Sequence, residues 1–462
     1  MDYSASNSFI WNPIVQSGIL AATILLANLV RKNVGFIRKL MMPTAVLGGF
    51  ILLILKITGL ISIDLRFMEA VTYHCIAIGF IATSLRIPSK TEEDKGNLVG
   101  LRSGAVIVGS YMIQAVTGLV ISILLAYTVM PGLFKASGIL LPMGYGQGPG
   151  QANNIGLSYE ALGFAGGRSF GLAIAAAGYL CACIVGVGYL NWLSKKGLLK
   201  KSASSADVAG SVTIDTFQDE DEIPISESVD RFSIQIALVL GVYLLTFLVT
   251  KHLTMGLSAI SEGLGNSLNS LLWGFNFMIG SGLAIGIRSI FASLRRSKIM
   301  TRQYQNNYLL SRISGFAFDL MIVAGIASIE PEDLSGLWLP FILMAVAGAV
   351  VTLVHLKYVC RKVYGNYYYE GLISMYGMMT GTISSGVLLL REIDPMFETP
   401  AANNLVIGSS FAILLGAPLL VLVSLAPRSD MMLFVTLGLI IAYYLVLLAI
   451  VNLKSGKKKK AE

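Results

Sequence analysis

Two glycine-rich segments carry the residues best suited to binding a small polar ligand. Residues 145–150 and 376–381 both follow the pattern Y-G-x-x-x-G, and a polar pair, Asn153-Asn154 or Ser384-Ser385, begins eight residues after each tyrosine. Glycine lets a backbone turn sharply, and a helix broken at such a turn presents carbonyl groups to a cation and N–H groups to an anion. The alternative is that the glycines serve close helix packing and the polar groups bond the broken backbone.

These segments and nearby polar groups supply two sets of candidate binding residues. The candidates for substrate binding are Tyr145, Gly146, Gln147, Gly148, Asn153, Asn154, Thr382, Ser384, Ser385 and Arg391. The candidates for a sodium site are Asp319, Thr380, Asn403 and Asn404. A charge such as Asp319 inside an apolar run costs about 2.5–3.5 kcal/mol, so it either binds a cation or proton or pairs with a basic loop residue. Arg391 either binds a carboxylate or helps to set the orientation in the membrane.

The composition excludes most soluble classes. Of the 462 residues, 55% are hydrophobic and 13% are charged, about half the share of a soluble domain. Too few polar residues remain to cover a soluble core, so a soluble enzyme, a disordered chain and a nucleic-acid binder are all disfavoured. The chain has neither a Walker motif for ATP nor an H-E-x-x-H motif, and we predict no catalytic residues and no cofactor.

Eleven apolar runs are long enough to cross a bilayer as helices. The spans are predicted at 9–31, 41–63, 68–87, 103–129, 169–193, 232–253, 268–290, 312–329, 336–359, 401–424 and 430–453. Segments 136–162 and 366–390 are also semi-apolar, but glycines interrupt them. We therefore treat these two segments separately.

The basic residues predict the orientation. With the eleven spans, 28 of the 34 lysines and arginines fall on one side, 5 fall on the other, and Lys56 lies within a span. Because basic residues collect at the cytoplasmic face, the N-terminus is predicted outside and the C-terminus in the cytoplasm. This distribution requires that 136–162 and 366–390 each enter and leave on the same face. Both segments are therefore predicted to be re-entrant hairpins.

The predicted fold is an all-α membrane protein made of two inverted repeats and one extra C-terminal transmembrane helix. Each repeat has five transmembrane helices and one re-entrant hairpin, and an odd number of crossings inverts the second repeat relative to the first. The predicted parts are an N-terminal repeat at 1–193, a cytoplasmic linker at 194–230, a C-terminal repeat at 231–424, and the extra helix with its basic tail at 430–462.

Four local patterns resemble the sodium/glutamate symporter family of bacteria, over roughly residues 9–424. Two basic residues precede a Pro and a Gly-Gly pair in 38–49, alternating glycines fill 144–150, acidic residues and a proline occupy 219–224, and 361–367 leads into the second hairpin. Within the first hairpin, Tyr145 and Gln147 stand where the family commonly has His and Thr.

The resemblance implies a sodium-coupled symporter of glutamate or a similar small amino acid or organic anion. It further implies an elevator-type mechanism, a homodimer, and a place in the bacterial inner membrane. The alternatives that remain are a proton- or sodium-coupled carrier of 2-hydroxycarboxylates or dicarboxylates, and a channel. No nucleic-acid partner is expected, because the excess of basic residues is explained by membrane orientation.

Overall fold

The regular structure is entirely helical in the part of the chain that the computed structural model describes, namely residues 3–39, 42–87, 97–198, 231–260, 272–274, 276–394 and 399–453. Within these ranges nine helices are long and apolar enough to cross a membrane. The shorter apolar helix α3 (Thr44–Ile57) and a pair of helices bent by 45°, α18 (Ala401–Leu415) and α19 (Ala417–Leu425), fall in two further predicted spans. Helices dominate because lipid offers no partner to an unbonded backbone group.

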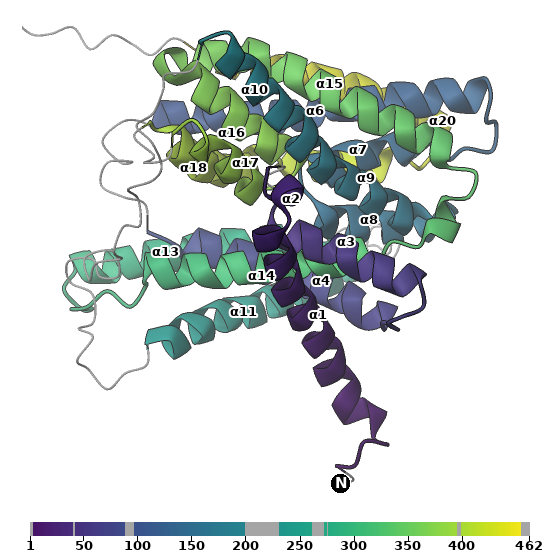
Figure 1. Ribbon diagram of the computed structural model, residues 1–462. Coiled ribbons are helices and arrows are strands. Elements are labelled where there is room, and N and C mark those ends of the chain that lie inside the picture. Colours follow the sequence, from purple (N-terminus) through teal and green to yellow (C-terminus); the bar gives the residue numbers. More distant parts are fainter. Residues whose placement is uncertain are drawn as a thin grey trace, which may run out of the picture.

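The helices form two layers, which lie one below the other in Figure 1. The lower layer contains α1 (Ser8–Asn33), α2 (Gly35–Lys39), α3, α4 (Leu65–Leu85), α11 (Arg231–Ile260), α13 (Asn276–Arg296) and α14 (Asn307–Ala327). The upper layer contains α6 (Asn97–Tyr127), α7 (Leu140–Tyr145), α8 (Pro149–Glu160), α9 (Gly167–Cys181), α10 (Val187–Lys195), α15 (Trp338–Val363), α16 (Tyr368–Thr380), α17 (Ile383–Arg391), α18, α19 and α20 (Asp430–Val451). Both layers therefore draw helices from each half of the chain.

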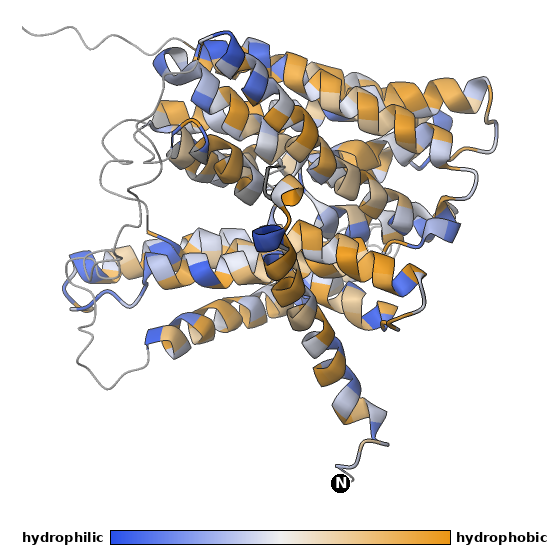
Figure 2. Ribbon diagram, in the orientation of Figure 1, coloured by the Kyte–Doolittle hydropathy of each residue, from blue (hydrophilic) through white to orange (hydrophobic). Residues whose placement is uncertain are grey.

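Polar side chains define several helix starts. Asp64 caps α4 by accepting hydrogen bonds from the backbone N–H groups of Arg66 and Phe67, and Asn306 caps α14 in the same way. Ser429 caps α20. Such caps satisfy N–H groups that have no partner within the helix. Figure 2 shows hydrophobic residues along the helices and hydrophilic residues gathered mainly near their ends.

Charged side chains join the two layers at the end that the charge distribution predicts to be outside. Arg168 at the start of α9 pairs with Glu69 of α4, and also with Glu330, at 3.4 Å, in the connection between α14 and α15. The neighbouring Ser169 hydroxyl donates to Asp333 at 2.7 Å. Arg168 is only 7% exposed and its carboxylate partners are half-buried, so these contacts are a partly buried link between the layers. We call Arg168, Glu69 and Glu330 the interlayer clamp.

Helix α20, predicted as an extra span, packs along α6 in the upper layer. At one end Asp430 pairs with Lys135 at 2.5 Å. At the other end the Arg102 guanidinium donates to the carbonyl of Val451 at 3.0 Å. These contacts attach α20 to the upper layer at both of its ends. Most of the predicted linker (199–230) and the basic tail (454–462) lie outside the described residues.

Candidate functional site

The first glycine-rich segment breaks the helix between α7 and α8. Helix α7 ends at Tyr145, and α8 begins at Pro149 after a turn at 146–148. Gly148 has φ +83°, a conformation that a residue with a side chain rarely adopts, and the fixed φ of Pro149 suits the first position of the new helix. No side chain caps the N-terminus of α8. Its first N–H groups therefore face the turn with no capping side chain.

The second glycine-rich segment breaks in a similar way between α16 and α17. Helix α16 ends at Thr380, Gly381 and Thr382 form the break, and α17 begins at Ile383. Thr382 occupies the capping position but makes no capping hydrogen bond, and its hydroxyl is buried without a partner among the described residues. This second helix start is also uncapped.

The two breaks meet at one cavity between the layers. The cavity has a volume of about 110 Å³, well above the roughly 10–15 Å³ that one water molecule needs. Gly146 and Gln147 line it from the first break, and Gly381 and Thr382 line it from the second. The breaks are neighbours, since a Cβ placed on Gly148 would lie 4.0 Å from Cγ2 of Thr382. Segments more than 200 residues apart in sequence therefore form one site.

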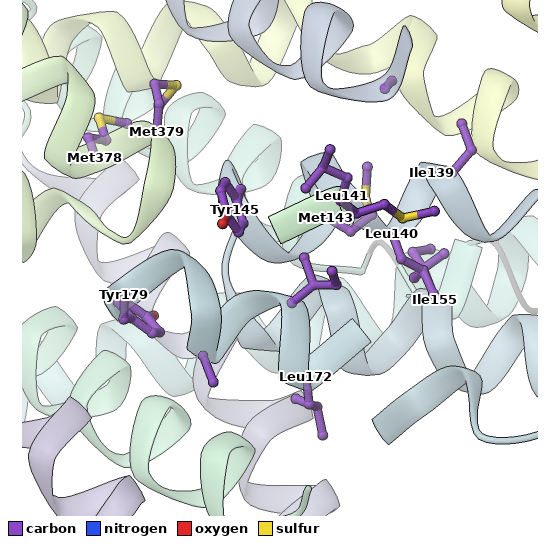
Figure 3. Close-up of a cluster of buried hydrophobic side chains, with 14 of the residues drawn as sticks. Ile139, Leu140, Leu141, Met143, Tyr145, Ile155, Leu172, Tyr179, Met378 and Met379 are labelled. Carbon is purple, nitrogen blue, oxygen red and sulfur yellow. The ribbon is translucent and has the colours of Figure 1, made fainter. Parts of the chain in front are cut away.

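Helix α9 holds the second break in place. It passes so close that a Cβ on Gly178 would lie 2.3 Å from the carbonyl oxygen of Thr380. The next residue, Tyr179, is fully buried, and its hydroxyl has no partner among the described residues. Figure 3 shows Tyr145, Tyr179, Met378 and Met379 within one cluster of buried hydrophobic side chains.

Buried polar atoms without partners gather around the cavity. Both amide atoms of Gln151, the Thr382 hydroxyl and the Ser385 hydroxyl find no hydrogen bond within the described part of the chain. Gln151 lines the cavity and is 1% exposed. A buried polar group without a partner is costly, so such groups in native proteins usually meet a ligand, an ion or a water molecule. The side of the cavity formed by the two breaks is therefore a candidate binding site for a polar group.

Gln114 of α6 supports this site from behind. Its side-chain nitrogen donates to the hydroxyl of Thr352 at 2.8 Å and to the carbonyl of Met379 at 2.9 Å. The Met379 carbonyl lies in the last turn of α16, where helix carbonyls lose their regular partners. Gln114 thus satisfies backbone that the second break releases.

Several predicted substrate-binding residues bond backbone instead of facing the cavity. The Tyr145 hydroxyl donates to the carbonyl of Ala345 at 2.6 Å, and the Asn154 amide donates to that of Gly274 at 2.9 Å. Asn153 is buried with its side-chain oxygen unpartnered in the described residues, and it does not line the cavity. Gly146, Gln147 and Thr382 do line it. Gly148 follows Gln147 in the chain, and the Ser385 hydroxyl lies beside the lining residue Gly381, 2.9 Å from where a Cβ of that glycine would be.

The predicted sodium-site residues are dispersed. The Thr380 hydroxyl donates to the carbonyl of Tyr376 in its own helix, and the Asn404 amide donates to the hydroxyl of Tyr367. Asp319 is half-buried on α14, outside the cavity lining, and close enough to Tyr179 to interact with it electrostatically. Its carboxylate makes no ion pair or hydrogen bond with any described residue. The remaining candidates have side chains outside the described structure, namely Ser384, Arg391 and Asn403.

Three residues of the site are missing from the candidates chosen from the sequence. Gln151 lies between Gly150 and the Asn153-Asn154 pair, so its position was a usable signal. Tyr179 and Gln114 belong to other helices. Gln114 is a polar residue inside the predicted span 103–129, which is a weak signal, whereas no local pattern marks Tyr179. Their role arises only when α6 and α9 pack against the second break.

Comparison with known proteins agrees with the resemblance seen in the sequence. No curated protein matches the chain. The profile of the sodium/glutamate symporter family matches residues 13–383, which include the first break, α16 and the second break up to Ile383. This match covers most of the chain, and the family is one of transporters rather than enzymes. The chain belongs to the sodium/glutamate symporter family.

Proposed function

We propose that this protein is a sodium-coupled secondary transporter of glutamate or a similar small amino acid or organic anion. The meeting of two uncapped helix starts at one cavity carries the proposal. The N-termini of α8 and α17 present N–H groups and the positive ends of two helix dipoles, which together suit a carboxylate. Membership of the symporter family supports sodium as the coupled ion.

Neutral oxygens near the second break are the proposed ligands for sodium. The Thr382 and Ser385 hydroxyls and the side-chain oxygen of Gln151 are buried and have no described partner, so an ion would satisfy them. Asp319 supplies negative charge next to Tyr179. In this proposal Asp319 attracts the cation, while Thr380 bonds its own helix and Asn404 bonds the Tyr367 hydroxyl.

The proposed mechanism is elevator-type alternating access. The upper layer carries both breaks and moves as a body against the lower layer, so that the cavity opens to each side in turn. This motion requires that 136–162 and 366–390 are re-entrant hairpins within two inverted repeats, 1–193 and 231–424. We further propose a homodimer in the bacterial inner membrane, with the N-terminus outside and the C-terminus in the cytoplasm.

Uptake into proteoliposomes tests the proposal. Purified protein is reconstituted, and labelled L-glutamate and a panel of other amino acids and dicarboxylates are offered with an inward gradient of sodium or of potassium. We expect saturable uptake of at least one of these substrates only with sodium. Asp319→Asn should raise the sodium concentration needed for half-maximal uptake. Ser289→Ala is the matched control, because this exposed hydroxyl on α13 bonds only its own helix.

Two outcomes would refute the proposal. Uptake that ignores the sodium gradient but follows a proton gradient would indicate a proton-coupled carrier. Flux that fails to saturate, with no exchange of internal for external substrate, would indicate a channel.

A further inference from the structure

The cavity has two halves of different chemistry. The polar half is made by the two breaks, with Gly146, Gln147 and Gln151 from the first and Gly381 and Thr382 from the second. The other half is mostly apolar and is shared between the layers. The lower layer contributes only apolar side chains, namely Ile76, Phe80, Phe277, Met278, Phe318 and Met321, and upper-layer residues such as Met378, Ile413 and Leu419 complete the lining. No described residue that lines the cavity carries a charge.

The apolar half is a continuous surface rather than scattered side chains. The Phe80 ring packs against Phe277 at a centroid distance of 5.0 Å and against Phe318 at 5.4 Å. Methionines adjoin these rings and provide flexible, polarizable contacts. The apolar surface reaches the first break directly, since a Cβ on Gly150 would lie 2.6 Å from Ile76 and 3.0 Å from the sulfur of Met321. We call the six lower-layer residues the apolar wall.

We propose that the transported substrate is an amino acid with a large apolar side chain, of the aliphatic, thioether or aromatic kind, rather than glutamate. This inference rests on the proposed function and narrows it. The α-carboxylate of the substrate binds at the N-termini of α8 and α17, and its α-ammonium group binds the side-chain oxygen of Gln147, which lines the cavity beside the proposed sodium ligands. The side chain of the substrate then lies against the apolar wall.

Glutamate fits this arrangement poorly because of its second carboxylate. Directed at the apolar wall, that group would lose its water among phenylalanine and methionine side chains with no cation among the described lining residues. An apolar side chain gains from the same burial. Adding or removing one methylene in an apolar pocket changes substrate selectivity by about 10–200-fold. Replacing an apolar side chain by a carboxylate is a larger chemical change, so we expect at least tenfold discrimination against glutamate.

The test is sodium-driven uptake of a panel in proteoliposomes, comprising L-leucine, L-methionine, L-phenylalanine, L-alanine and L-glutamate. We expect kcat/KM for at least one of the three large apolar substrates to exceed that for glutamate by tenfold or more. Excess unlabelled leucine, methionine or phenylalanine should also inhibit uptake more strongly than glutamate.

Two wall variants sharpen the test. Phe80→Ala should raise KM for the best apolar substrate more than KM for alanine, because only a long side chain reaches the wall. Met278→Arg adds a cation to the wall and should shift the preference towards glutamate. Phe316→Ala is the matched control, because this α14 phenylalanine is 63% exposed and lies outside the cavity lining. Thermal unfolding of each variant identifies any that fail to fold.

The outcomes separate this inference from the function on which it rests. Sodium-driven glutamate uptake that apolar amino acids neither match nor inhibit would overturn the inference and leave the symporter function standing. Unchanged substrate preference in a folded Phe80→Ala variant would overturn it too. Absence of sodium-driven uptake for every amino acid and dicarboxylate offered would refute the symporter function itself.

Discussion

The contact between α9 and the second break gives a sharp test of how the site is built. Gly178→Ala places a Cβ that would lie 2.3 Å from the carbonyl oxygen of Thr380 and 2.9 Å from the Tyr145 ring. A carbon normally stays about 3.3–3.6 Å from a carbonyl oxygen, so α9 and the break must separate by about 1 Å. Extra atoms in a packed core cost about 1–3 kcal/mol. A shift of about 1 Å at a site that positions a substrate can lower activity about 10²-fold.

Thermal unfolding and sodium-driven uptake measure the two effects of this substitution. We expect Gly178→Ala to lower the free energy of unfolding by about 1–3 kcal/mol and to reduce uptake far more than this destabilisation explains. Gly188→Ala on α10 is the matched control, because nothing lies within 4 Å of its added Cβ. A Gly178→Ala protein with wild-type stability and wild-type uptake would refute the close packing of α9 against the break.

Three other predictions concern contacts away from the cavity lining. Arg168→Met should lower the free energy of unfolding by about 1–3 kcal/mol, since it leaves two half-buried carboxylates unpaired, and adding Glu69→Gln should restore part of the loss in a double-mutant cycle. Gln114→Leu should cost about 1–3 kcal/mol and raise KM, because the carbonyl at the end of α16 loses its partner. A hydrogen bond from the Asn12 amide and, to a smaller extent, bonds from backbone N–H groups lower the pKa of Asp64. The Asp64 carboxylate therefore stabilises the fold above its ordinary pKa of about 3.9 and loses that contribution as pH falls. Asn12→Ala should therefore destabilise the protein at pH 7, and thermal unfolding between pH 3 and pH 7 should show the difference from wild type shrinking below about pH 4.

The helices and their breaks could be predicted from the sequence because both follow from local composition. A bilayer requires apolar helices of about 20 residues, and all eleven predicted spans contain helix in the described structure. The paired Y-G-x-x-x-G patterns marked the two places where helices end, at Tyr145 and at Thr380. Helix α3 is shorter than its predicted span of 41–63, since Pro43 precedes its first residue and Thr58 ends it.

The partners of individual side chains could not be predicted in the same way. Tyr145, Asn154 and Asn404 stand beside the breaks in sequence, but their polar groups bond Ala345, Gly274 and Tyr367 in distant segments. Which polar group meets the cavity depends on how helices from both halves of the chain pack. A single sequence does not show which residues of two helices lie opposite each other when the helices pack. The same limit explains why Tyr179 had no local signal and why Gln114, although visible as a polar residue within a span, could not be assigned to the site.

The division of the cavity between the two layers has a consequence for the motion that we propose. The polar half, which would hold the charged groups of the substrate, belongs to the upper layer, and the apolar wall belongs to the lower layer. An apolar surface offers no hydrogen bonds or ion pairs to break, so the substrate can slide past it while its charged groups stay bound. The interlayer clamp, by contrast, ties Arg168 to Glu69 across the two layers. In an elevator motion this partly buried ion pair must open whenever the layers move, so the clamp should set the balance between the two end states.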